Sequence, residues 1–168
     1  MKYIKHFIIA LSALLLQGCW GWGYSNDDDF SGPQQQQNFK AVTMKRSQLE
    51  SSIALKPAKA VTDAGKIYIK NNTMYVTEVN KGFHVFNYTN PENPVAVAYI
   101  EVPGATDLAI RDNSLYINQA VDLVTLNYTG NAVTVTGRVR AVFPQKQAPD
   151  DSYESLGEDE IIINWIPK

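Results

Sequence analysis

One pattern of residues occurs twice in the middle of this 168-residue chain. The first copy begins IYIKNNTMYV at Ile67, and the second begins LAIRDNSLYI at Leu108. Matching residues are 41 positions apart at the start of the pattern and 40 apart at Asn87 and Asn127, where both copies read Asn-Tyr-Thr. A repeat of about 40 to 45 residues, rich in Val, Ile, Tyr and Thr, is typical of a four-stranded propeller blade. The repeat therefore predicts an all-β fold of about two propeller-type blades of antiparallel strands.

Each copy is expected to contribute four strands, within units at residues 65–104 and 105–143. Asn71 and Asn72 in the first copy, and Asp112 and Asn113 in the second, separate the first two strands, because Asn and Asp tolerate the positive φ of tight hairpin turns. The expected strands cover residues 66–70, 73–80, 82–89 and 95–102 in the first unit, and 107–111, 114–120, 122–129 and 132–143 in the second.

The first 18 residues have the pattern of an export signal. Lys2 and Lys5 precede an apolar run over residues 7–16 that is too short to span a bilayer as a helix. Leu16, Gly18 and Cys19 then resemble the lipobox of bacterial lipoproteins. The resemblance implies that the signal peptidase recognises Leu16 and Gly18, and that Cys19 becomes acylated and binds membrane lipid. The alternative is a plain secretory signal followed by an unmodified Cys19.

Residues 19–43 are expected to form a flexible tether, because their first part is rich in Gly, Ser and Gln without helical or strand periodicity. The tether contains three consecutive aspartates, Asp27, Asp28 and Asp29. Calcium loops space their oxygen ligands around a glycine turn, so this run is interpreted as a solvated acidic segment. A short helix and a lead-in to the repeat are expected over residues 44–64. Ser47 and Glu50 match the capping-box pattern of a helix over residues 47–53.

Charge and composition exclude several classes of function. The formal net charge is −2, whereas a nucleic-acid-binding surface would show a basic excess. The single cysteine cannot form an intrachain disulfide, and two histidines are too few for a histidine-based metal cluster. We therefore expect no nucleic-acid partner, no metal site and no cofactor.

The repeat and the residues before it also resemble the opening of bacterial LVIVD-repeat β-propeller lipoproteins. The resemblance covers MKRSQLESSI at residues 44–53 and continues over residues 55–128. The strand that gives the family its name corresponds to FHVFN at residues 83–87 and LVTLN at residues 123–127, with Asn87 and Asn127 where the family pattern has Asp. The resemblance implies an exported, surface-associated propeller protein. It implies no reaction, because most members have no assigned function.

The chain is short for a propeller. A closed ring needs about four to eight blades, and the residues from Pro57 onward correspond to fewer than three units. We expect either the N-terminal part of a longer propeller, which we favour, or a ring completed by self-association. Residues 144–168 read as an acidic loop followed by an isoleucine-rich strand, which would begin a third blade or pair with the edge of the second unit.

Catalytic motifs are missing from the sequence, which has no Gly-x-Ser-x-Gly elbow, phosphate-binding loop or His-Glu-x-x-His helix. His84 could act as a base oriented by Glu78, but a strand histidine satisfied by its neighbours is the preferred interpretation. Asp107 and Asp122 are expected at equivalent strand starts near the turns of the second unit, where they could line a central channel, although turn-forming roles are preferred. No catalytic, cofactor-binding or metal-binding residue is assigned.

These observations together predict a lipid-anchored lipoprotein of the bacterial cell envelope, at the outer membrane or cell surface. Its propeller-type module would bind an envelope protein or a glycan and would not be an enzyme by itself. Two alternatives stay open. One is part of a hydrolase or lyase whose site needs missing blades or a partner chain, and the other is a truncated fragment without a function.

Overall fold

The computed structural model describes residues 37–168. It confirms the all-β expectation, with one short helix in this part of the chain. The elements in order are β1 (Phe39–Lys45), α2 (Arg46–Ser51), β2 (Ala54–Lys56), β3 (Ala64–Lys70), β4 (Thr73–Glu78), β5 (Gly82–Asn87), β6 (Val95–Glu101), β7 (Ala105–Arg111), β8 (Ser114–Gln119), β9 (Asp122–Tyr128), β10 (Val133–Val139) and β11 (Glu160–Pro167). Within residues 37–168, no helix is long and apolar enough to cross a membrane.

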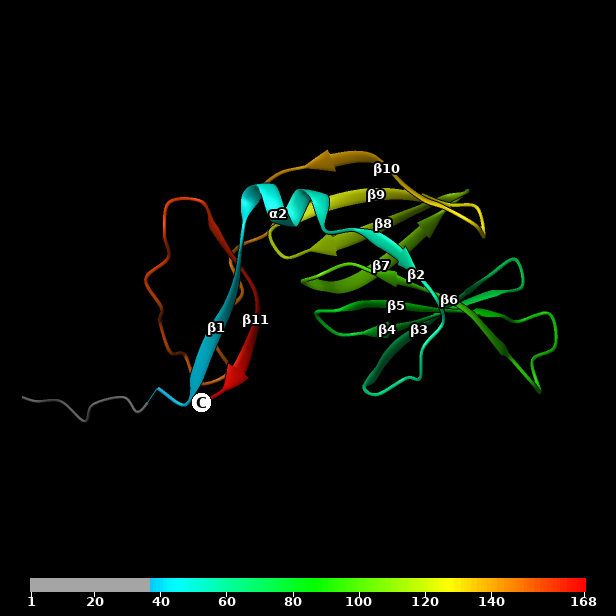
Figure 1. The fold of residues 1–168 in the computed structure, drawn as a ribbon, viewed down its shortest axis with the longest axis horizontal. Helices are drawn as coiled ribbons and strands as arrows, with labels where there is room; N and C mark the ends of the chain where they lie inside the picture. Colours follow the sequence, from blue (N-terminus) through cyan, green and yellow to red (C-terminus); the bar gives the residue numbers. More distant parts are fainter. Residues whose placement is uncertain (1–36) are drawn as a thin grey trace, which may run out of the picture. The chain divides into compact units, whose positions relative to one another are not determined.

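Two antiparallel sheets contain the two copies of the repeat (Figure 1). The first sheet has the strand order β2-β6-β5-β4-β3, and the second has the order β10-β9-β8-β7. All eight expected strands are present, although β10 ends at Val139 and not at residue 143. The lead-in contributes an unexpected strand, because β2 pairs with the edge of the first sheet along β6.

Both predicted hairpins form at equivalent places. Asn71 and Asn72 have φ angles of 48° and 60° between β3 and β4, and Asp112 has a φ of 51° between β7 and β8. These angles lie in the left-handed region that Asn and Asp occupy more easily than other side chains. The turn chemistry that suggested the hairpins therefore fixes their geometry.

The change of the repeat period from 41 to 40 has a structural cause. Glu78 pairs with Gly82 across a three-residue turn in the first sheet, whereas Gln119 pairs with Asp122 across a two-residue turn in the second. The first copy thus has one additional residue between its second and third strands. This insertion makes Gly82 the counterpart of Asp122.

An apolar core joins the inner faces of the two sheets. Its fully buried centre combines Phe83, Val85 and Ile100 from the first sheet with side chains of the second. Stacking the sheets removes both inner faces from water, which supplies the main favourable term for folding. The buried contributors from the second sheet are Ala105, Leu108, Leu115, Ile117, Val124 and Leu126.

The C-terminal strand pairs differently from both expectations. β11 forms a separate two-stranded antiparallel sheet with β1, in which Phe39 lies opposite Pro167 and Lys45 opposite Glu160 (Figure 1). It neither begins a third repeat nor joins the second sheet. The prediction of a flexible tether up to residue 43 is also wrong at its end, because β1 begins at Phe39.

The acidic segment is a loop, as expected, and its carboxylates bind backbone. Asp150 Oδ2 accepts a hydrogen bond from the Asn38 amide at 2.9 Å, and Glu154 Oε2 accepts one from the Ala41 amide at 2.8 Å. These bonds satisfy donors along the edge of β1 that β11 does not use. They also cover an otherwise unpaired strand edge.

The predicted helix exists, but its cap is shifted by two residues. α2 spans Arg46–Ser51 with Lys45 at the N-cap, and the Gln48 side chain accepts the Lys45 amide proton at 3.2 Å. Ser47 is therefore not the N-cap. Glu50 contacts Arg46 and Arg140 and does not reach back to the Ser47 amide, so the capping box expected there is wrong.

Candidate functional site

An open groove lies where the two Asn-rich hairpins end. We call it the turn-end groove; it has a volume of about 620 Å³ and is lined by both sheets. Its lining residues are Lys70, Asn71, Asn72, Thr73, Tyr75, Val85, Phe86, Asn87, Thr89, Val97, Ile110, Asp112, Asn113, Leu115, Tyr128, Thr129 and Gly130. Because hairpins at equivalent repeat positions come together here, the duplication itself builds the groove.

Aromatic and aliphatic side chains form the inner part of the turn-end groove. Tyr75, Val85 and Leu115 are buried and belong to the core between the sheets. The rings of Tyr75 and Tyr128 meet edge to face, with centroids 6.4 Å apart and an interplanar angle of 78°. This arrangement fixes both rings beside the groove and presents a rigid apolar surface to a ligand.

Amides and hydroxyls occupy the rim of the turn-end groove. Asn71, Asn72 and Asn113 are exposed at the hairpin turns. Asn87 is oriented by its own turn, because its Oδ1 accepts hydrogen bonds from the Thr89 amide at 3.0 Å and the Thr89 hydroxyl at 2.7 Å. These two bonds also explain the Asn-Tyr-Thr motif of the first copy as turn chemistry.

The two tyrosines of the turn-end groove remain neutral at physiological pH. Burial raises the pKa of Tyr75 to about 12, with a smaller contribution from Tyr128. Burial also raises the pKa of Tyr128, whose hydroxyl donates to the Gly130 carbonyl oxygen at 3.2 Å. The charged side chains among the lining residues are one amine, Lys70, and one carboxylate, Asp112. The groove is therefore polar, aromatic and close to electrically neutral.

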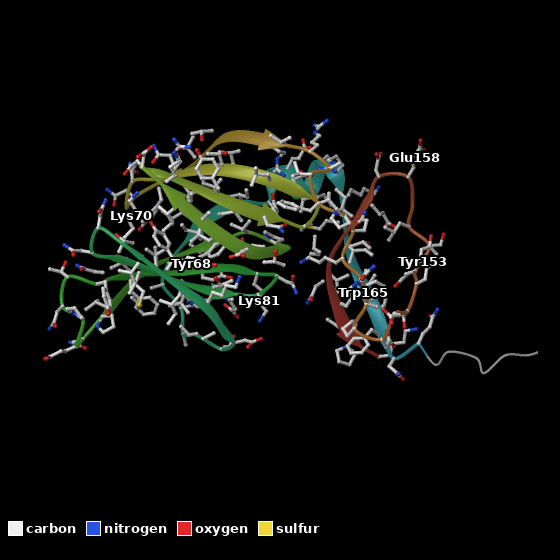
Figure 2. The ribbon with its side chains drawn as sticks, turned by 180° about the vertical axis from the view of Figure 1, so that it is seen from behind. Tyr68, Lys70, Lys81, Tyr153, Glu158 and Trp165 are labelled. Carbon is white, nitrogen blue, oxygen red and sulfur yellow. The ribbon has the colours of Figure 1, made fainter. Side chains whose placement is uncertain are left out.

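The opposite end of the first sheet holds a buried carboxylate with four donors; Figure 2 shows Lys70 and Lys81 at the two ends. Glu78 is 1% exposed and accepts hydrogen bonds from the hydroxyl of Thr62 at 2.6 Å, and from the ammonium groups of Lys59 and Lys81 at 2.9 Å. The fourth partner is His84 Nε2, at 2.9 Å from Glu78 Oε2. We call these five residues the Glu78 cluster.

The contacts of the Glu78 cluster indicate a structural role. Burial alone would raise the pKa of Glu78, but the hydrogen bonds from Thr62, Lys59, Lys81 and His84 outweigh it and hold the pKa well below its usual range. Lys59 also lies 3.9 Å from the centroid of the Tyr99 ring, which packs against His84. Through the contacts of Lys59 and Thr62, the cluster holds the loop between β2 and β3 against the first sheet.

Asp122 is a buried carboxylate of the second sheet, and it too is bonded to several donors. It is fully buried and accepts hydrogen bonds from Arg46 at 2.6 Å, Arg138 at 2.7 Å and the Ala141 amide at 3.1 Å. Burial opposes ionisation, but the two guanidinium groups and the amide keep the pKa of Asp122 below its ordinary value. Asp122 therefore connects α2, β9 and the end of β10.

The structure separates the residues that a catalytic interpretation would combine. His84 contacts Glu78 as expected, while Asp107 binds Lys66 at 2.8 Å together with the Tyr68 hydroxyl, and Asp122 binds two arginines. Asp122 begins β9 as expected, but Asp107 does not begin a strand, because β7 starts at Ala105. No group of metal-binding side chains occurs within residues 37–168. Leu16, Gly18, Cys19 and the aspartates at residues 27–29 lie outside the described residues.

Sequence reasoning missed the partners of the Glu78 cluster that lie outside the repeat. Lys59 and Thr62 belong to a loop without strand periodicity, and no pattern indicated that it would fold over the sheet. A signal did exist within the repeat: Glu78 matches Gln119, and both positions are polar at the end of an apolar strand. Such a pair predicts a buried polar site in each copy.

Comparisons of this chain with protein-family models, with curated proteins and with solved structures found no match.

Proposed function

We propose that this chain is a lipid-anchored binding module of the bacterial envelope, and that its turn-end groove takes an uncharged oligosaccharide. The observation that carries the proposal is the lining of the groove. Amides and hydroxyls surround two fixed aromatic rings, and a single carboxylate and a single amine are the charged groups present.

A neutral sugar chain matches this lining in two ways. Its hydroxyl and amide groups can both donate and accept, as can the side chains of Asn72, Asn113 and Thr129. Its C–H faces can pack on the rings of Tyr75 and Tyr128. A charged ligand would find little compensation in a groove with one amine and one carboxylate.

Binding fits the groove better than sugar hydrolysis. Most glycoside hydrolases need two carboxyl groups on either side of the scissile bond. Asp112 is the one carboxylate among the lining residues, and the other lining side chains include no cysteine or histidine. The hydrolase or lyase alternative needs missing blades or a partner chain to complete its site, and within this chain His84, Asp107 and Asp122 each have their own set of partners.

The membrane anchor rests on the resemblance of residues 16–19 to a lipobox. We expect labelled palmitate to enter the wild-type chain in a bacterial host and to be lost in Cys19→Ser, which removes the one thiol in the sequence. Failure of the wild-type chain to incorporate label, or retention of label by Cys19→Ser, would contradict the anchor.

Calorimetric titration with N-acetylglucosamine tetramer and maltotetraose tests the groove. Tyr128→Ala removes one of the two tyrosine rings that meet edge to face in the groove and should weaken binding about tenfold, equivalent to about 1.4 kcal/mol. Asn113→Ala changes an exposed rim residue and should weaken binding without affecting folding.

Tyr153→Ala is the matched control, since Tyr153 is 78% exposed on the acidic loop and is not part of the groove. It should bind like the wild-type protein. The sugar proposal fails if neither probe binds, and capture of an envelope protein through the same groove would then identify the other class of partner. Equal loss of affinity in Tyr128→Ala and Tyr153→Ala would also contradict the site.

A further inference from the structure

The outer face of the first sheet carries exposed apolar side chains. Ile67 is 59% exposed and Ile69 is 53% exposed on the edge strand β3. Their cross-strand partners on the same face are Val76 and Met74, and Phe86 is the next residue across. We call Ile67, Ile69, Met74, Val76 and Phe86 the open face. The residue between the two isoleucines, Tyr68, points the other way and packs against the core.

The second copy of the repeat shows how the same face packs when another sheet covers it. The counterparts of the open-face residues in the second copy are Leu108, Ile110, Leu115, Ile117 and Leu126. Four of these five are buried and Ile110 packs against them, all in the core between the sheets. The same face of the repeat is therefore a docking face in the second copy. In the first copy Ile67 and Ile69 are exposed on it, Met74 and Phe86 are half-buried, and Val76 is buried.

A receiving face can be identified in the same way. The docking face of the second sheet packs on a surface of the first sheet that includes Tyr68, Tyr75 and Val85. Their counterparts in the second copy are Ala109, Tyr116 and Thr125, on the outer face of the second sheet. Ala109 is exposed, and Tyr116 and Thr125 are half-buried. We call these three residues the receiving face.

We propose that the open face of one copy of this chain packs head-to-tail on the receiving face of a second copy. The contact would repeat between chains the stacking that already joins the two sheets within one chain. This inference concerns the outer faces of the sheets and is carried by Ile67 and Ile69, which do not line the turn-end groove; Phe86 is the one open-face residue that also lines it.

Charge complementarity supports the head-to-tail arrangement. Lys66 and Asp107 occupy equivalent positions in the two copies of the repeat, and they form an ion pair between the sheets at 2.8 Å. At the contact between chains, Asp107 of one copy would face Lys66 of the next, so equivalent positions again have opposite charges.

The symmetry of this contact limits the assembly. A head-to-tail interface uses two different surfaces, so it closes into a ring or grows as an open chain. Each chain supplies two repeat sheets, so a ring of four to eight stacked repeat sheets needs two to four copies of the chain.

Sedimentation velocity of the full chain carrying Cys19→Ser tests the contact without any acyl group. The parent chain should sediment as two to four copies. Ile69→Asp blocks the open face and Ala109→Arg blocks the receiving face, so each should be a monomer. An equimolar mixture of the two variants should form a dimer, because Ala109→Arg keeps its open face and Ile69→Asp keeps its receiving face.

Ile166→Asp is the matched control: Ile166 is 43% exposed on β11, outside both faces, and its variant should assemble like the parent. Circular dichroism of all variants checks that they fold, and the mixture reports only on folded chains. A monomeric parent chain overturns the proposal. So does an Ala109→Arg variant that still assembles, which would mean that the open face pairs with itself.

Discussion

Gly82→Ala should lower the free energy of unfolding by about 4 kcal/mol, the largest loss we expect from a single methyl group in this chain. Gly82 has a φ of +144°, which side chains rarely adopt, and it follows the additional residue in the turn between β4 and β5. A Cβ at this position would overlap the carbonyl oxygen of Ile100 and lie 2.9 Å from the amide nitrogen of Val102. Both obstacles are backbone atoms, the first within β6 and the second directly after it, so they cannot rotate away as a side chain could.

Substitutions at two other glycines separate the two causes of this loss, which are the strain of a positive φ and the overlap of the Cβ with neighbouring atoms. Gly130 has a φ of +91°, but a Cβ at this position would have no other atom within 4 Å, so Gly130→Ala should cost only the conformational strain of about 1 to 2 kcal/mol. Gly137→Ala meets Thr125 at an ordinary contact distance of 3.6 Å and should change stability by less than about 0.5 kcal/mol. Urea denaturation of the three variants checks the order. A Gly82→Ala loss no greater than that of Gly130→Ala would contradict the described turn.

Glu78→Gln should cost about 3 kcal/mol at neutral pH. The substitution keeps the shape of the side chain but removes the charge that compensates Lys59 and Lys81, and its amide group would direct hydrogens at two donors. Removing one partner from a buried, hydrogen-bonded ionic cluster typically lowers the free energy of unfolding by several kcal/mol. The matched control is Glu101→Gln, because Glu101 is 42% exposed and pairs with Lys56 at 3.5 Å, so we expect a change below about 1 kcal/mol.

The same substitution should flatten the pH dependence of stability. The folded-state pKa of Glu78 lies below its ordinary value of 4.5, so its contribution is complete above that pH and is lost as the pH falls toward the folded-state pKa. The stability difference between the wild-type protein and Glu78→Gln should therefore be largest near neutrality and shrink below about pH 4.5. A difference that grows on acidification would contradict the ionised state of Glu78.

The repeat made much of this fold predictable. Local signals placed the hairpins, because Asn71, Asn72 and Asp112 adopt the positive φ that their side chains favour. The alternation of apolar residues set the inner and outer faces of each strand. Even the one-residue insertion before Gly82 was visible as a change of period, although only the pairing of Glu78 with Gly82 revealed its place in a turn.

Contacts between distant segments could not be read from the sequence. β1 pairs with β11 at a separation of more than 100 residues, and nothing in FKAVTMK specifies that register. The loop carrying Lys59 and Thr62 is ordered by its bonds to Glu78 and not by its own pattern. The turn-end groove likewise depends on how closely two hairpins approach when the sheets stack, which is a property of the core between them.

Nuclear magnetic resonance titration of the isotope-labelled chain with N-acetylglucosamine tetramer and maltotetraose tests the proposed site most directly. Binding should shift the signals of the Asn71, Asn72 and Asn113 side-chain amides and of the Tyr128 ring, while signals from the Glu78 end of the first sheet stay in place. Shifts concentrated around His84 and Lys81, or none in the turn-end groove at saturating sugar, would contradict the account.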